Sequence, residues 1–120
     1  MRIFKIKWFE RFARKNSLTD EALRAAVAEI EAGNFSANLG GNVYKQRVAR
    51  QGQGKSGGYR TIVLLKHGER AFFVYGFAKS ELDNIDDKDI KRLKENARDM
   101  LNMNNTVIAN CLRSSSLVEI

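Results

Sequence analysis

Periodic runs of apolar residues divide the first third of the chain into one strand and two helices. Residues 2–7 alternate between charged and bulky apolar side chains, which predicts a short half-buried strand. Residues 9–15 place Phe and Ala at helical spacing. Residues 17–33 begin with hydroxyls and carboxylates, continue with an apolar stripe and end in a glycine. Two consecutive helices are therefore expected after the first strand.

The middle of the chain has the composition of a β-sheet. Small and polar residues over 35–42 indicate a connecting loop. Three segments rich in β-branched and aromatic residues then predict strands, over 43–50, 59–66 and 70–78. A glycine-rich loop joins the first two of these strands, and His67-Gly68 is suited to a tight turn between the second and third. An antiparallel meander is expected.

The final third predicts two helices and a short strand. Acids at 86, 87 and 89 stand where the start of a helix favours negative charge, and an apolar face follows them. A shorter helix is expected over 106–113, with Cys111 as a small core residue, and the apolar tail 117–120 is expected to add a strand to the sheet. One domain over 1–120 is expected, because domains typically have about 100–200 residues.

The charge of the chain is one-sided and indicates the class of its partner. There are 21 Lys and Arg against 14 Asp and Glu, a formal net charge of +7, and no acid occurs between Glu31 and Glu69. A long run of one sign produces a positive field that an extended polyanion can follow. Nucleic acid is the first candidate partner, and an acidic protein is the second.

Composition also limits the compartment and the cofactors. The hydrophobic content of 43% is that of a soluble globule, and no apolar run approaches the ~18 residues of a membrane span. Cys111 is the only cysteine, which excludes an internal disulfide and favours a reducing cytoplasm. His67 is the only histidine, which argues against a protein metal site. We expect a cytoplasmic protein without membrane contact, metal or cofactor.

The Gly-Lys-Ser triplet at 54–56 is superficially similar to a phosphate-binding P-loop. That motif needs a glycine where this chain has Ala49, and it must lead from a strand into a helix whose amino end holds the phosphates. Here a strand follows instead. A nucleotide hydrolase is therefore not expected.

Five cations surround this glycine-rich loop and are the first candidates for function: Lys45, Arg47, Arg50, Lys55 and Arg60. A solvated face would explain isolated charges, but such a face normally mixes signs. Alternation along 43–50 places Lys45 and Arg47 on one face and Tyr44, Gln46, Val48 and Arg50 on the other. Arg60 is the clearest candidate, because it begins a very apolar strand in phase with Ile62 and Leu64, where a charge should be at least partly shielded. Its guanidinium has five donors in a fixed geometry suited to phosphate oxygens.

Aromatic residues of the strand over 70–78 are divided between core and site. Phe72, Phe73 and Phe77 are predicted to be core. Tyr75 is expected to share a face with Phe73 and Phe77, and its hydroxyl and ring could bond to or stack on a base.

Taken together, these residues resemble a known family. The segment 45–60 reads Lys-Gln-Arg-Val-Ala-Arg-Gln-Gly-Gln-Gly-Lys-Ser-Gly-Gly-Tyr-Arg, which is similar to the signature of a subgroup of the RelE/HigB bacterial type II toxins. The resemblance continues in Phe-Lys-Ile-Lys-Trp-Phe at 4–9 and in Val-Tyr-Gly-Phe-Ala-Lys-Ser at 74–80. It covers nearly the whole chain.

The resemblance implies a small α/β (α+β) fold: amino-terminal helices packed on a curved antiparallel sheet of about four strands, with carboxy-terminal helices. It implies an mRNA interferase that inhibits translation without a metal, usually in the ribosomal A site, and a cognate helix-turn-helix antitoxin. Arg60, Lys45, Arg47 and Lys79 are the catalytic residues it implies, and Arg50, Lys55 and Tyr75 are candidates for RNA binding. Lys45 or Lys79 could act as general base or acid. The chain departs from some relatives at Ser80, where they carry arginine, and it lacks their carboxy-terminal tyrosine or histidine acid.

Three alternatives remain at this stage. A RelE-like protein without catalysis could act as a module that binds RNA, the ribosome or an antitoxin. A gyrase-directed ParE-like toxin would share the fold, but such relatives generally lack the cation set represented here by Lys45, Arg47 and Arg60. A DNA-binding protein is disfavoured, because no predicted helix concentrates Arg and Lys on one face as a recognition helix does.

Overall fold

The computed structural model describes residues 1–49, 58–78 and 86–120. Three of the predicted site residues, Arg50, Lys55 and Lys79, lie outside the described residues. Four helices are described: α1 (Lys7–Lys15), α2 (Asp20–Glu31), α3 (Asp87–Leu101) and α4 (Asn105–Arg113). Six strands are described: β1 (Arg2–Ile6), β2 (Ala37–Gly40), β3 (Val43–Val48), β4 (Tyr59–Lys66), β5 (Arg70–Ala78) and β6 (Leu117–Glu119). None of the described helices is both long and apolar enough to cross a bilayer.

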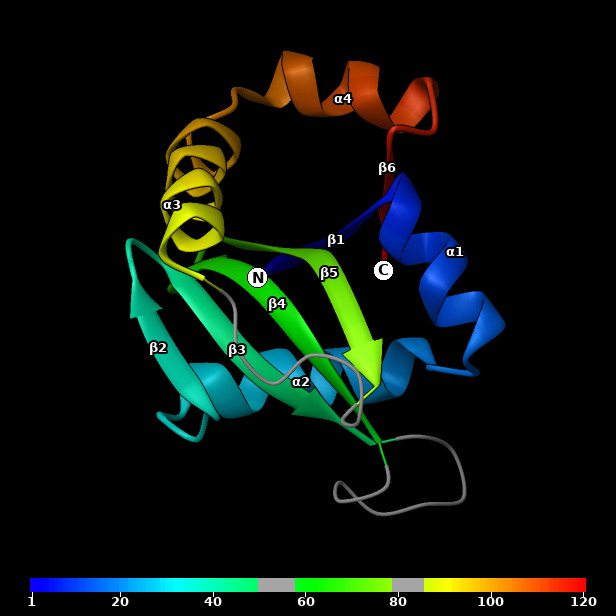
Figure 1. Cartoon of the computed structure of the whole chain (residues 1–120). Coiled ribbons are helices and arrows are strands. Elements are labelled where there is room, and N and C mark those ends of the chain that lie inside the picture. The colour runs from blue at the N-terminus through cyan, green and yellow to red at the C-terminus, as the bar shows by residue number, and fades with distance from the viewer. Residues whose placement is uncertain (50–57, 79–85) are drawn as a thin grey trace.

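All six strands form one mixed sheet in the order β2-β3-β4-β5-β1-β6 (Figure 1). The predicted meander β3-β4-β5 is confirmed, and so is the carboxy-terminal strand β6. The prediction of about four antiparallel strands was wrong in two respects. Residues 35–42 were expected to be a loop, but Ala37–Gly40 pairs with β3, and β1 is inserted parallel to β5. Both pairings satisfy the hydrogen-bonding needs of backbone N–H and C=O groups, which the pattern of side chains does not reveal.

Helices cover the two faces of the sheet with separate cores (Figure 1). On one face, α1 and α2 pack against the sheet through buried residues such as Phe9, Leu23 and Ile30. On the other face, α3 and α4 contribute Ala97, Leu101 and Ile108 to a core that includes Val43, Ile62, Leu64 and Phe72. Cys111, predicted to be core, is only half-buried at the margin of this second cluster.

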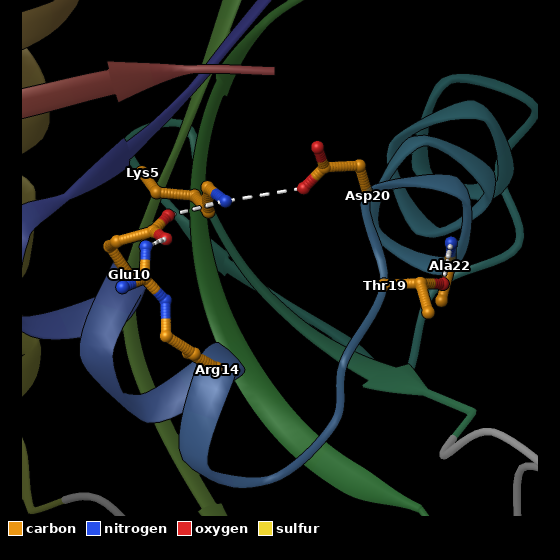
Figure 2. A network of polar contacts seen from close by, with 6 residues as sticks. All are labelled: Lys5, Glu10, Arg14, Thr19, Asp20 and Ala22. Carbon is orange, nitrogen blue, oxygen red and sulfur yellow. Dashed lines mark hydrogen bonds and ion pairs between the residues drawn. The ribbon is translucent and has the colours of Figure 1, made fainter.

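A buried lysine joins β1 to both amino-terminal helices (Figure 2). Lys5 is only 6% exposed, and its Nζ lies 2.5 Å from a carboxylate oxygen of Glu10 in α1 and 3.2 Å from one of Asp20 in α2. Thr19 begins α2 by accepting a hydrogen bond from the backbone N–H of Ala22, so one of the two hydroxyls predicted to cap this helix does so. The ion pairs thus tie both α1 and α2 to β1.

A β-bulge in β5 changes the side on which its aromatic residues lie. Val63 pairs with Phe73, but Ile62 pairs with Tyr75, so Val74 is the extra residue. Phe73 belongs to the core under α1 and α2, whereas Tyr75 is paired with a residue of the opposite core. The prediction that Tyr75 and Phe77 share a face with Phe73 was therefore wrong. Both lie on the face that carries Ile62, because the bulge shifts the alternation by one position.

Candidate functional site

The register between β3 and β4 brings three of the predicted cations to one face of the sheet. Arg47 is paired directly with Arg60, and Lys45 is paired with Ile62. Residues paired across an antiparallel ladder project to the same side, so these three side chains share the face of Ile62 and Val43. The core under α3 covers the early part of β3 and the late part of β4. The cations lie toward the other ends of these two strands.

A cleft of about 510 Å³ contains all three cations. It is open to solvent along β3 and is bounded by the segment that connects α2 to β2. Its lining consists of Glu29, Gly33, Asn34, Phe35, Ser36, Ala37, Lys45, Gln46, Arg47 and Arg60. Three cations and one carboxylate line it, so the charge of the described lining favours a negatively charged ligand.

Arg60 is held differently from Arg47. Arg47 is exposed, whereas Arg60 is half-buried at the start of an apolar strand, as predicted. Within the described residues, the buried Nε of Arg60 donates no hydrogen bond. Leaving a buried donor unpaired costs about 1–3 kcal/mol, and more when the group is charged. A ligand oxygen that reached this N–H would recover that energy, which is a property of binding sites more than of packing residues.

Gln46 builds the wall of the cleft from the opposite face of β3. Its side chain is buried, and its Nε2 donates to the carbonyl oxygens of Ala26 at 3.3 Å and Asn34 at 2.8 Å. Its Oε1 accepts hydrogen bonds from the backbone N–H groups of Ser36 and Arg47, each at 3.2 Å. One amide thus ties the middle of α2 and the segment after this helix to the strand that carries Lys45 and Arg47.

Sequence reasoning missed part of the cleft. Glu29, Ser36 and Gln46 all line it. Glu29 and Ser36 precede the 45–60 signature, and Gln46 lies within it but on the face of β3 opposite Lys45 and Arg47. Glu29 flanks the apolar stripe of α2, where a charged residue normally faces solvent. Gln46 was assigned correctly to the face opposite Lys45 and Arg47. Its burial and its hydrogen bonds depend on contacts with α2 and the segment after this helix, which the sequence does not show.

The other predicted residues are not all in this cleft. Tyr75 lines a separate hollow beside α1, where its ring stacks on Trp8 with centroids 5.0 Å apart. Arg50, Lys55 and Lys79 fall outside the described residues. His67, in the predicted turn between β4 and β5, lies with its Nε2 3.4 Å from the hydroxyl of Tyr44 and does not line the cleft.

Metal-binding side chains do not converge in the part of the chain that is described. There, no three residues among His, Cys, Asp and Glu lie together as the ligands of a metal ion would.

Comparison with known proteins identifies the family. No curated protein matches the chain by sequence. The family model described as the RelE toxin of the RelE / RelB toxin-antitoxin system matches residues 1–120, that is, the whole chain. This match agrees with a mixed sheet flanked by helices and with a cationic cleft on one side of it. The chain belongs to the RelE toxin family of toxin–antitoxin systems.

Proposed function

We propose that this toxin is a metal-independent endoribonuclease that cuts mRNA, at the ribosomal A site, and thereby inhibits translation. Membership of the RelE family supports a toxin. The observation that carries the proposal further is the cross-strand pair of Arg47 and Arg60 in one cleft with Lys45. Like charges placed opposite each other repel, so this arrangement is stabilised by an anion such as a phosphodiester.

The proposed reaction is an in-line attack by the ribose 2′-hydroxyl on the adjacent phosphorus. The hydroxyl loses its proton to a base, a bond forms between the 2′-oxygen and phosphorus, and the bond to the 5′-oxygen breaks. The leaving 5′-oxygen takes up a proton from an acid. The products are a 2′,3′-cyclic phosphate and a 5′-hydroxyl, so no external oxidant, reductant or metal is required for balance.

Arg60 is proposed to clamp the scissile phosphate. Its half-buried guanidinium and the unpaired Nε–H point to a group that donates to an oxygen gaining charge in the transition state. Arg47 lies opposite and can donate to a second phosphate oxygen, and Lys45 holds the backbone on the same face. The general base and acid are proposed to be Lys45 and Lys79.

Expression in living cells is the first test. Induction of the wild-type chain is expected to arrest growth and to produce mRNA ends inside codons, whereas Arg60→Ala is expected to do neither. Arg24→Ala is the matched control, because Arg24 is an exposed arginine on α2 that does not line the cleft. Equal toxicity of a folded Arg60→Ala protein would contradict the assignment of Arg60. Normal growth with the wild type would favour a binding module without catalysis.

A reaction with purified components tests the chemistry. The protein is mixed with ribosomes carrying a defined mRNA, at constant magnesium, and the new ends are analysed. Attack by the 2′-hydroxyl leaves a cyclic phosphate and a 5′-hydroxyl that polynucleotide kinase labels without prior phosphatase. A single 2′-deoxy nucleotide on the 5′ side of the scissile bond should block cleavage. Cleavage of that substrate, or a 5′-phosphate end, would exclude this mechanism. Omitting the ribosome shows whether cleavage depends on it.

The family implies an antitoxin partner. We propose that this antitoxin is a helix-turn-helix protein encoded next to the toxin and that it neutralises the toxin by covering or distorting the cationic cleft. Co-expression of the neighbouring reading frame should restore growth. If the adjacent reading frame does not encode the antitoxin, the two chains should not co-purify.

A further inference from the structure

A continuous stack of aromatic rings lies on the surface where α1 meets β5. Trp8 is stacked on Phe12, with centroids 5.4 Å apart and planes 11° apart, and on Tyr75, with centroids 5.0 Å apart and planes 17° apart. These rings are not core: Trp8 is 44% exposed and Tyr75 is 40% exposed. Two large aromatic side chains held nearly parallel at the surface form an exposed, preformed aromatic platform.

Cations accompany this platform. Trp8, Arg11, Phe12 and Lys15 recur at intervals of three or four residues, so they lie on one face of α1. They line a hollow of about 500 Å³ together with Tyr75. Arg11 and Lys15 are exposed, and no acidic residue is among the described residues that line this hollow. The carboxylate of α1, Glu10, is engaged elsewhere with Lys5 and Arg14.

We propose that the hollow between α1 and β5 binds unpaired nucleotides of RNA, with bases stacked on Trp8 and Tyr75 and phosphates held by Arg11 and Lys15. Stacking on aromatic rings combined with cations that follow a phosphate backbone is how proteins hold single strands without reading their sequence. This inference rests on the proposed function, because it takes RNA to be the substrate. It adds a second contact, outside the cationic cleft, that extends the length of RNA the toxin covers.

Two observations favour RNA over a protein partner. The first is the cationic lining of the hollow, which is complementary to phosphate and lies beside a ring stack in which Phe12 stacks on Trp8 and contacts Tyr59 edge-on. The second is position: Tyr59 lines this hollow and Arg60, the next residue, lines the cleft. Tyr75 of β5 and Arg60 of β4 project from the same face of adjacent strands, so one RNA strand can reach both.

The sole tryptophan of the chain makes the test direct. The Arg60→Ala protein is titrated with an unstructured RNA of about 12 nucleotides, a length typical of single-strand sites, and intrinsic fluorescence is recorded. Binding is followed separately by anisotropy of labelled RNA. Stacking of a base on Trp8 should quench its emission. A matched RNA duplex and inorganic polyphosphate, which offer no free base, should bind without comparable quenching. Because the Arg60→Ala protein is not expected to cleave RNA, the titration measures binding separately from cleavage.

Variants separate the two halves of the proposed site. Trp8→Ala should weaken binding of the single strand by about 5–150-fold, the range for loss of one stacked base. The double variant Arg11→Gln with Lys15→Gln should lower the slope of log affinity against log salt by about 1–2. The double variant Lys88→Gln with Lys91→Gln removes two exposed cations of α3 outside the hollow and is the control. Single-strand binding without quenching, equal quenching by the duplex, or unchanged affinity of Trp8→Ala would each overturn the proposal.

Discussion

Arg47 and Arg60 are direct partners across the β3–β4 ladder and project from the same face of the sheet. Two guanidiniums in this relationship repel each other, and directly opposed like charges destabilise a sheet. The buried, unpaired Nε of Arg60 adds a further unfavourable contribution. The arrangement is therefore poor for the stability of the free protein and well suited to an anion that lies between the two groups.

Replacing Arg60 should thus increase stability while removing function. Arg60→Met keeps much of the side-chain volume, and we expect it to raise the free energy of unfolding by about 0.5–1 kcal/mol because it removes both the repulsion and the unpaired donor. Cleavage should fall by at least about 100-fold, the typical effect of losing one transition-state donor. Urea unfolding and a cleavage assay measure the two effects. A folded variant that is less stable than the wild type would show that Arg60 is a packing residue.

Gln46 should support the cleft through its hydrogen bonds. Gln46→Leu leaves the carbonyl groups of Ala26 and Asn34 and the N–H of Ser36 without this partner. We expect a loss of about 1–3 kcal/mol in the free energy of unfolding, together with weaker cleavage because the wall of the cleft is released. Asn38→Ala is the control, since it removes one exposed side-chain hydrogen bond from the neighbouring β2. Equal effects of both substitutions would argue against a special role for Gln46.

The ion pair between Lys5 and Glu10 should make stability depend on pH. The hydrogen bond from Lys5 lowers the pKa of Glu10 below its ordinary value of 4.5, despite an opposing contribution from burial. A carboxyl with a lowered folded-state pKa stabilises the protein above its unfolded-state pKa, and this contribution is lost as the pH falls through the folded-state value. Glu10→Gln should therefore lower the free energy of unfolding by about 1–3 kcal/mol near neutral pH. The difference from the wild type should shrink as the pH falls below 4.5.

Glu119 provides a matched control for this experiment. Its pKa is also lowered, by the hydrogen bond from Arg2, but both side chains of that pair are well exposed. Solvent screens such a pair, so Glu119→Gln should change stability by less than about 1 kcal/mol. Urea denaturation of both variants across the acid range distinguishes the two pairs. A loss for Glu119→Gln as large as that for Glu10→Gln would contradict the importance assigned to burial of Lys5.

Gly76 should be required for the aromatic stack. A Cβ at this position would overlap the ring of Phe12, which supports Trp8. Gly76→Ala is expected to cost about 1–3 kcal/mol, as overpacking does, and to shift the fluorescence of Trp8 because the stack must move. Gly33→Ala is the control: its backbone has a φ of +88° but nothing lies near the added Cβ. That substitution should destabilise the protein without altering the emission of Trp8.

The sequence predicted local structure well where one face of an element follows a period. The apolar stripe and Thr19 predicted α2, and the alternation in β3 placed Lys45 and Arg47 on the face opposite Tyr44 and Gln46, as the structure has it. The sequence also predicted that Arg60 would be partly shielded, because its neighbours in phase are Ile62 and Leu64.

The same patterns could not predict every pairing of the strands. Residues 37–40 have the polarity of a loop, yet they pair with β3, and β1 lies parallel to a strand far along the chain. Lys5 is an ordinary surface residue by composition, and it is buried only because two helices bring Glu10 and Asp20 to it. The bulge at Val74 has no composition signal, and it moved Tyr75 to the other face.

What the amino-acid sequence determined by itself is the identity and the phase of Lys45, Arg47 and Arg60, because side chains alternate between the two faces along an uninterrupted strand. What the tertiary structure decided is the register that opposes Arg47 to Arg60, the cleft wall tied by Gln46, and the ring stack of Trp8 on Tyr75. These three features join residues far apart in the chain. Their energies depend on contacts that exist only after the sheet and helices have packed, so no local pattern encodes them.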